Sequence, residues 1–356
     1  MNKKKFSEVI RIGRKLIGRG QPALIIADIG ANFDGSFEKA KKLAWAVKEA
    51  GGDVVKIQSF LAPKIVSGRG FSSMKLQGIH GKWGKPVSEV FKAAEFPRKW
   101  HKKFFDYCRE IGIGVSSSPY DFEVVDLMEE LGASFYKIGS GDITWHEIIE
   151  YIAKKGKPVI LATGASTLAE VDEAVQVIEK TGNHNLALLQ CVTNYPSKIE
   201  SANLRVIDTY KQAFGCIVGY SDHTLGDTVV LGSIALGAKV IEKHFTLNKN
   251  DAGPDHPHSM EPAEFALMVK RIRDMEKALG SSRKEVATEE SETVIVQRRS
   301  LYARKNIRKG AKLSRSDIVE LRPALGILPK LKNAVLGRRA KKDIQALEPL
   351  HFEDLQ

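Results

Sequence analysis

Eight short apolar runs recur along the first 244 residues, and each ends in a polar or ionisable side chain. Stretches with apolar residues at helical spacing separate the runs, for example 37–50, 122–131, 168–180 and 227–236. Alternation of strand and helix predicts a parallel sheet, and eight repeats predict an α/β fold, a (β/α)8 TIM barrel ringed by helices. The predicted strands are 23–28, 53–58, 113–118, 135–140, 158–163, 186–193, 216–222 and 239–244.

The polar residues at the strand ends are expected to meet, because all strands of such a barrel deliver their carboxyl ends to one mouth. Active sites of this fold lie at that mouth. Two lysines, several carboxylates and two histidines there predict an enzyme. The residues so placed are Asp28, Lys56, Gln58, Ser118, Lys137, Asp142, Thr163, Tyr195, Asp222, His223 and His244.

The chain is longer than one barrel of about 250 residues, so a second domain is expected. A helical pattern over 262–279 closes on Gly280, and a polar stretch at 281–292 is typical of a linker. Short runs of alternating apolar and polar residues with turn signals follow. They predict a small β-rich domain that has little core of its own and packs against a larger domain. The expected divisions are a basic N-terminal extension at 1–20, the barrel at 21–280, a linker at 281–296 and the small domain at 297–356.

The net charge of +12 lies outside the predicted barrel. Residues 1–20 hold seven Lys and Arg against one Glu, and residues 281–356 hold seventeen against ten acidic residues. A nucleic-acid surface would combine such charge with interleaved aromatics, but the basic N-terminal segment has only Phe6. We therefore expect a solvated extension and no nucleic-acid partner.

Three cysteines, Cys108, Cys191 and Cys216, lie in apolar or strand-like settings without CxxC spacing. This pattern favours buried, reduced thiols over disulfides or zinc. The sequence contains no apolar run of 18 residues, and no apolar segment follows the basic start. We expect a cytoplasmic protein with no membrane span and no secretory signal.

Two histidines stand at the ends of neighbouring predicted strands. His223 follows the seventh strand and His244 ends the eighth, which brings both imidazoles within reach of one cation. Two nitrogen ligands with carboxylates nearby suit a borderline transition metal better than Mg²⁺ or Ca²⁺. We predict a metal site with positions open for water or substrate. The alternative is that each histidine is a hydrogen-bonded barrel residue.

Two lysines, Lys56 and Lys137, also end predicted strands. A buried lysine is costly without an anionic partner. The backbone of 139–141, Gly-Ser-Gly, can approach an anion, and Ser118 and Ser221 add hydroxyl donors. The pattern predicts a site for phosphate, or for phosphate and carboxylate together. A Schiff-base lysine is the rival interpretation, and lysines that extend outward between helices are the structural alternative.

Three acidic residues complete the candidate chemistry. Asp28 and Asp142 follow strands and could position a hydroxyl or relay a proton. Asp255 lies on a Pro/Gly-rich loop after the eighth strand, where loops commonly cover the barrel mouth. Each could instead be a helix N-cap or a turn residue.

Short motifs at these strand ends resemble those of the sialic acid synthase family, which includes N-acetylneuraminate, legionaminate and pseudaminate synthases and the spore-coat polysaccharide protein E group. The resemblance extends over residues 22–355, and the C-terminal motifs at 299–301 and 322–327 resemble an antifreeze-like SAF domain. The barrel motifs are ADIGAN at 27–32, KIQ at 56–58, YKIGSGD at 136–142, KPVILATG at 157–164, YP at 195–196, GYSDHT at 219–224, EKHFTL at 242–247 and GPDH at 253–256.

The resemblance implies that phosphoenolpyruvate condenses with an N-acylated hexosamine, either ManNAc-like or a 2,4-diacetamido sugar. The products are a nine-carbon 2-keto acid and phosphate, for surface polysaccharide biosynthesis. The resemblance also implies Mn²⁺ or another divalent metal, no organic cofactor, and a homodimer in which each SAF domain caps the partner's barrel.

Motif matching assigns roles residue by residue. The metal ligands are His223 and His244. The catalytic residues around the reacting atoms are Asp28, Asp142, Gln58 and Tyr195. The substrate-binding residues are Lys56, Ser118, Lys137, Ser140, Thr193, Ser221, Asp255 and, reaching across the dimer, Arg322.

The chain departs from the family at several aldehyde-facing positions. Asp28 and Asp142 stand where the family writes glutamate, Phe33 replaces a usual histidine, Thr193 replaces the asparagine or serine before Tyr-Pro, and Ala324 replaces a glycine. A shortening by one methylene can misplace a catalytic group enough to cost about 10²-fold in rate. Two alternatives therefore stay open: another enzyme that condenses phosphoenolpyruvate with an aldose, and a catalytically weakened, sugar-binding homologue.

Overall fold

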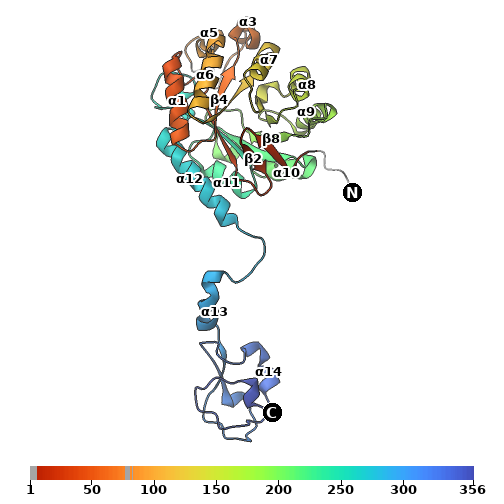
Figure 1. Ribbon diagram of the computed structural model, residues 1–356, viewed down its shortest axis with the longest axis vertical. Helices are drawn as coiled ribbons and strands as arrows, with labels where there is room; N and C mark the ends of the chain where they lie inside the picture. Colours follow the sequence, from red (N-terminus) through yellow and green to blue (C-terminus); the bar gives the residue numbers. More distant parts are fainter. Residues whose placement is uncertain (1–5, 77–80, 82) are drawn as a thin grey trace. The chain divides into compact units, whose positions relative to one another are not determined.

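The computed structural model describes residues 6–76, 81 and 83–356, and the chain divides into two compact units. The first unit ends at Gly280 and the second runs from Ser281 to Gln356 (Figure 1). The buried apolar residues of the two units form separate clusters. None of the described helices combines the length and the apolar character needed to cross a membrane.

The first unit is a ring of eight parallel strands in the order β5-β4-β3-β10-β9-β8-β7-β6. The end strands β5 and β6 lie side by side, and the Ser116 hydroxyl donates a hydrogen bond to the Phe135 carbonyl at 2.8 Å, which nearly closes the ring. This confirms the predicted barrel. The strands are β3 (Leu24–Asp28), β4 (Val54–Ser59), β5 (Gly114–Pro119), β6 (Tyr136–Ile138), β7 (Val159–Ala162), β8 (Leu186–Cys191), β9 (Ile217–Asp222) and β10 (Val240–His244).

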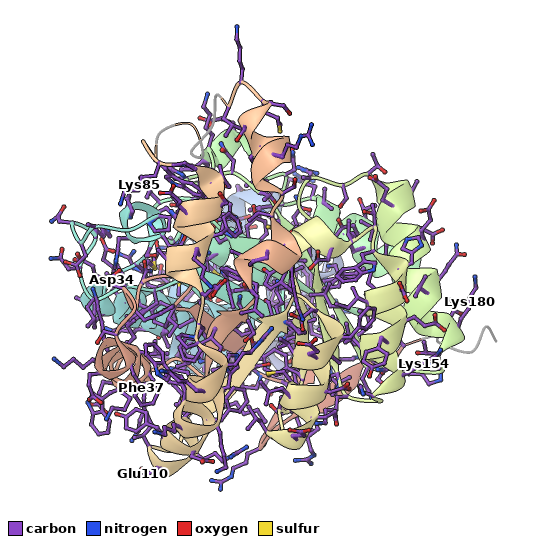
Figure 2. All side chains as sticks on the ribbon, turned by 90° about the horizontal axis from the view of Figure 1, so that it is seen from above. Asp34, Phe37, Lys85, Glu110, Lys154 and Lys180 are labelled. Carbon is purple, nitrogen blue, oxygen red and sulfur yellow. The ribbon has the colours of Figure 1, made fainter. Side chains whose placement is uncertain are left out.

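Amphipathic helices surround the strands (Figure 1). In α9 the buried residues are Val171, Ala174, Val175 and Ile178, a helical spacing that turns one apolar stripe toward the sheet. Figure 2 shows the last residues of α6, α8 and α9 (Glu110, Lys154 and Lys180) toward the outside of the ring. The surrounding helices are α1 (Phe37–Glu49), α6 (Arg98–Glu110), α7 (Phe122–Glu130), α8 (His146–Lys154), α9 (Leu168–Lys180), α10 (Val206–Phe214), α11 (Thr228–Ala235) and α12 (Pro262–Leu279).

The connection between β4 and α6 is the longest in the barrel and carries extra helices. Those within the described residues are α2 (Ala62–Ile65), α3 (Gly68–Ser72) and α5 (Val87–Ala94). The side chain of Glu95 accepts a hydrogen bond from the Ala62 backbone amide at 2.6 Å. This bond joins the start of the connection to its end. The connection leaves the barrel just after Gln58, so it borders the mouth.

The prediction that the N-terminal segment is a solvated extension is wrong. Residues 9–18 form an antiparallel hairpin of β1 (Val9–Ile12) and β2 (Lys15–Gly18). Ile10, Ile12 and Ile17 are buried in the same apolar cluster as the barrel interior, while Arg11 and Lys15 are exposed. Successive side chains of a strand point to opposite faces, so the isoleucines can be buried while the basic residues stay exposed. This is how so basic a segment packs against the barrel.

The second unit is small and rich in turns, as predicted. It contains α13 (Ser291–Gln297), the antiparallel pair β11 (Ser300–Ala303) and β12 (Ile318–Leu321), and α14 (Lys332–Val335). Its buried residues form one cluster that includes Leu301, Ile307, Ile318 and Ile327. Helix α13 occupies the end of the predicted linker, so that segment is partly helical.

A buried ion pair on the outer side of the sheet joins β9 to β10. The Lys243 ammonium lies 2.6 Å from Asp222 Oδ2, and both side chains are at most 1 % exposed. The ammonium also donates to the carbonyls of Thr224 and Gly226, the latter at 3.0 Å. Because Asp222 precedes His223 and Lys243 precedes His244, this pair fixes the two strand ends that carry the histidines.

We predict that Lys243→Met lowers the free energy of unfolding by about 3–5 kcal/mol, because it leaves the Asp222 carboxylate buried and uncompensated. Urea unfolding followed by circular dichroism measures the effect. The matched control is Lys249→Met, since Lys249 makes a solvent-exposed pair with Glu264 that should contribute about 1 kcal/mol or less. Equal losses in both variants would show that the buried pair has no special role.

Candidate active site

Asp28 is the centre of a buried polar cluster at the barrel mouth. Its Oδ2 lies 2.7 Å from the Lys56 ammonium, 3.0 Å from the Gln58 side-chain amide and 3.6 Å from His244 Nε2. Its Oδ1 accepts from the Gly30 backbone amide at 3.0 Å. Burial alone would raise the pKa of Asp28, but Lys56 and His244 hold it well below its usual range. The carboxylate is therefore ionised, and it links residues from β3, β4 and β10.

Glu242 is a central residue to which the sequence analysis gave no role. Its two carboxylate oxygens lie 3.5 Å from Lys56 Nζ and 3.3 Å from Lys137 Nζ, and all three side chains are nearly fully buried. Lys56 Nζ also lies 3.3 Å from the Ser118 hydroxyl. The two lysines predicted to share an anion thus share a carboxylate of the chain itself. Strand alternation was a usable signal, because Glu242 and His244 are two residues apart and face the same side.

The predicted hydroxyl donors fall into two places. Ser118 and Ser221 are buried within the mouth, where the Ser221 backbone pairs in register with Glu242. Ser140 accepts a hydrogen bond from the Gly164 amide at 2.9 Å. A Cβ on Gly164 would lie 2.1 Å from Thr193 Oγ1, so Thr193 packs here too. Thr193 lines a separate cavity of about 710 Å³ beside the start of α9, away from Asp28.

The aromatic side of the mouth is built around Tyr195. Its ring centroid lies 4.2 Å from that of His223 and 5.9 Å from that of His244, and the two imidazoles are 5.5 Å apart. His223 Nδ1 lies 2.9 Å from the Val192 carbonyl, which can only accept, so Nδ1 carries a proton and Nε2 is the ring nitrogen left for a metal. The structure therefore brings both predicted histidines together.

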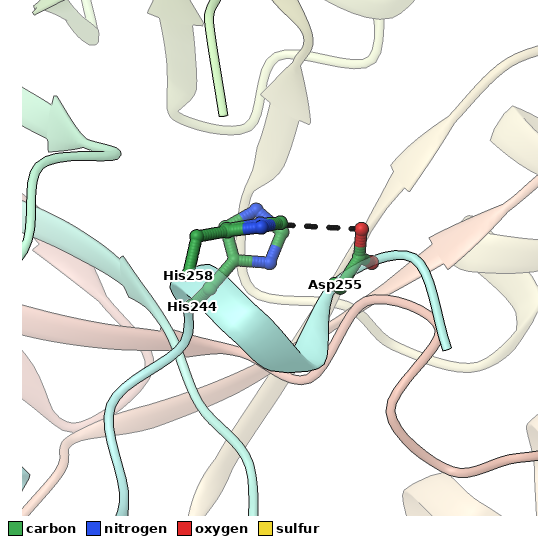
Figure 3. A group of neighbouring side chains, drawn as sticks. All are labelled: His244, Asp255 and His258. Carbon is green, nitrogen blue, oxygen red and sulfur yellow. Dashed lines mark ion pairs between the residues drawn. The ribbon is translucent and has the colours of Figure 1, made fainter. Parts of the chain in front are cut away.

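A third histidine, His258, joins this cluster and was not anticipated. It lies in the short 3-10 turn after β10, with its ring centroid 4.8 Å from His244 and 5.0 Å from Tyr195. Its Nε2 is 4.0 Å from Asp255 Oδ1 (Figure 3). The ligand atoms of His244, Asp255 and His258 all lie within 4.8 Å of one another, close enough to hold one metal ion.

Two predicted residues lie apart from this cluster. Asp142 is half-buried in the 3-10 turn after β6, near Lys137, and none of its side-chain contacts reaches the Asp28 carboxylate within the described part of the chain. Arg322 is exposed in the second unit, just after β12. Its predicted role across a dimer remains a prediction.

A second acidic–imidazole group beside α1 has its polar atoms already paired. Asp34, Asp251 and His256 lie within mutual ligand distance, but the Lys39 ammonium pairs with both carboxylates. His256 donates from Nε2 to Asp34 Oδ1 at 2.9 Å and accepts at Nδ1 from the Thr246 hydroxyl at 2.7 Å. This group anchors the loop after β10 and is not a candidate metal site.

Comparison with known proteins identifies the family. The profile of the NeuB family matches residues 43–284, and that of the SAF domain matches residues 298–356. This chain belongs to the NeuB family. Membership confirms the resemblance predicted from the strand-end motifs.

Individual relatives span nearly the whole of this NeuB-family chain. The N,N'-diacetyllegionaminic acid synthase of Campylobacter jejuni is 39 % identical over 322 residues, which cover 90 % of this chain and 96 % of that protein. The pseudaminic acid synthase of Helicobacter pylori is 35 % identical, covering 94 % and 98 %. The crystal structure of spore coat polysaccharide biosynthesis protein SpsE from Bacillus subtilis is 32 % identical, with a TM-score of 0.66 over 98 % of this chain and 99 % of that one.

The donor set of this NeuB-family chain fits a divalent transition metal. Among the described residues, His244 Nδ1 and both ring nitrogens of His258 are buried without a hydrogen-bond partner. Burial lowers the pKa of His244, and burial with the neighbouring His244 and His223 lowers that of His258 to about 2, so both rings are neutral. Neutral imidazoles beside a carboxylate suit Mn²⁺, Fe²⁺, Co²⁺ or Zn²⁺ better than Mg²⁺.

We predict that Asp142→Asn stabilises this NeuB-family chain at alkaline but not at acidic pH. Burial, partly opposed by Lys137, raises the pKa of Asp142 from 3.8 to about 6. The native state therefore holds the proton more tightly than the unfolded state, and wild-type stability falls as pH rises from about 4 to about 6. Asparagine carries no proton to lose, so the variant should gain about 1–3 kcal/mol at pH 8 and little at pH 4.

Urea unfolding across this pH range measures the difference between variant and wild type. Asp274→Asn, at an exposed position on α12, is the matched control and should show no such dependence. A gain for Asp142→Asn that does not change with pH would contradict the effect of burial.

Proposed function

We propose that this chain condenses phosphoenolpyruvate with the open-chain aldehyde of an N-acylated hexosamine, giving a nine-carbon 2-keto acid and phosphate. The observation that carries the proposal is the pair of buried ammonium groups, Lys56 and Lys137, beside an imidazole and carboxylate cluster at one barrel mouth. The chain's NeuB relatives are named as legionaminic and pseudaminic acid synthases, which supports an acylated amino sugar as second substrate.

The two lysines would hold the phosphate and carboxylate of phosphoenolpyruvate as point charges. Burial acts to lower the pKa of Lys56, but Asp28 and Glu242 raise it above its ordinary value, so the amine stays protonated. A protonated amine is not a nucleophile, which disfavours the Schiff-base alternative. Ser118 is within 3.3 Å of Lys56 Nζ and adds a hydroxyl donor to the same site.

Asp28 would position the water that adds to the substrate, because it is an ionised hydrogen-bond acceptor held by the Gln58 amide. His223, His244 and Asp255 would hold a divalent metal, for which Mn²⁺ is the expected ion. Such a metal polarises an aldehyde oxygen toward attack.

The proposed sugar side of the site includes a small cavity with both polar and apolar lining residues. A space of about 80 Å³ opens beside Gln58 and Asp255 and is lined by Phe60, Val90 and Pro254, among others. A larger cavity of about 810 Å³ shares Val90 and Pro254 and extends toward Asp34 and Lys85, which lie on one side of the barrel in Figure 2. Apolar walls next to polar groups suit the methyl of an N-acyl substituent, which supports an acylated sugar.

Phosphate release from phosphoenolpyruvate tests the proposal, with Mn²⁺ and a panel of N-acetylmannosamine, 2,4-diacetamido hexoses and arabinose 5-phosphate. We expect turnover with an acylated amino sugar. Lys137→Met should raise the phosphoenolpyruvate KM and reduce kcat by about 10²–10³-fold, as loss of a charge-stabilising donor does. Lys154→Met, exposed on α8, is the control and should behave as wild type.

Turnover with arabinose 5-phosphate alone would favour the alternative aldose-condensing enzyme. Metal binding without phosphate release from any sugar would favour the sugar-binding homologue. Borohydride trapping of pyruvate on Lys56 or Lys137 would overturn the assignment of the lysines.

We further propose a homodimer in which the second unit of one subunit covers the partner's barrel and supplies Arg322. Family resemblance and the exposure of Arg322 within its unit support this arrangement. Mixing inactive His223→Ala subunits with inactive Arg322→Ala subunits should restore part of the activity, because some heterodimers then carry one intact composite site. Heterodimers that form, as seen by native mass spectrometry, yet stay inactive would contradict the shared site.

A further inference from the structure

His258 and His256 lie in the same 3-10 turn but have opposite hydrogen-bonding states. Both ring nitrogens of His256 are paired, one with Thr246 and one with Asp34. Neither ring nitrogen of His258 has a hydrogen-bond partner among the described residues, although its side chain is only 1 % exposed. An unpaired buried polar group costs about 1–3 kcal/mol, so the position of His258 calls for a ligand that the protein does not itself supply.

The position of His258 is set by the fold of its loop. The Ser259 hydroxyl donates to the Asp255 carbonyl at 2.6 Å and accepts from the Asn32 side chain at 2.9 Å. The Met260 amide donates to the His244 carbonyl at 2.9 Å, which pairs the end of the loop with the end of β10. These bonds hold His258 against His244 in the absence of any other partner.

Asp255 is fixed on the opposite side of the same space. Its Oδ2 accepts from the Ala31 amide at 2.9 Å, and its Oδ1 lies 4.0 Å from His258 Nε2. A Cβ on Gly30 would come within 2.3 Å of Asp255 Oδ2, so only glycine leaves room for the carboxylate at this position. The free oxygen of Asp255 therefore faces His258 and His244 across a gap of ligand dimensions (Figure 3).

We propose that His258 is a metal ligand, a third imidazole beside the proposed ligands His223, His244 and Asp255. The sequence pattern offered only His223 and His244 as ligands. With His258, the centre has a donor set that selects a transition metal over Mg²⁺ and leaves positions for substrate. The assignment rests on the proposed function, because it describes the metal centre of that reaction.

Metal titration of the full-length chain without substrates tests the assignment. Calorimetric Kd values for Mn²⁺ and Co²⁺ should rise by more than about 100-fold in His258→Leu, because loss of an outer-sphere contact alone costs about 10–100-fold. His258→Asn is the second variant should leucine impair folding, as judged by circular dichroism. His146→Gln, at a partly exposed position on α8, is the control and should bind metal as wild type.

Electron spin-echo measurements on the Mn²⁺-loaded protein detect nitrogen atoms bound to the metal. Their result would not change in the variant if His258 only packed against its neighbours. Wild type should show one more coupled imidazole nitrogen than His258→Leu. Wild-type metal affinity and an unchanged spectrum in both His258 variants would overturn the proposal, even if kcat falls. Phosphate release by wild type tests the proposed function separately, so either claim can fail without the other.

Discussion

Two ammonium groups buried at the carboxyl end of the barrel require two buried carboxylates. Lys56 and Lys137 are nearly inaccessible to water, and an isolated buried charge costs several kcal/mol. Asp28 and Glu242 supply the opposite charges, at 2.7 to 3.5 Å from the ammonium nitrogens. The four groups come from four different strands, so the charges balance only when the barrel has formed.

The Asp28 carboxylate also connects the lysine side of the mouth to its imidazole side. Asp28 pairs with Lys56 and also lies 3.6 Å from His244 Nε2. His244 in turn makes edge-to-face ring contacts with Tyr195 and His258. On the outer side of the sheet, the Lys243–Asp222 pair holds the strand ends that carry both histidines. Displacement of Asp28 would therefore disturb the proposed phosphoenolpyruvate site and the proposed metal centre together.

The barrel and most of the mouth could be predicted, because parallel strands place their last residues at one edge. Lys56, Gln58 and His244 meet Asp28 for this reason. Glu242 could also have been predicted, because it lies two residues before His244 on the same strand and faces the same side. The position of His258 could not, because it depends on hydrogen bonds that the Ser259 and Asn32 side chains make in an irregular loop. The N-terminal hairpin was missed because its charge concealed the alternation of Ile10 and Ile12 with exposed residues.

The central claim is that the buried Lys56 stays charged because Asp28 and Glu242 balance it. The most direct test is heteronuclear NMR of the 15N-lysine-labelled protein, with the Nζ resonances of Lys56 and Lys137 assigned by substitution and followed against pH. The account predicts that Lys56 remains an ammonium beyond pH of about 10.4, the ordinary pKa of lysine. A neutral amine at Lys56 near pH 8 would contradict it.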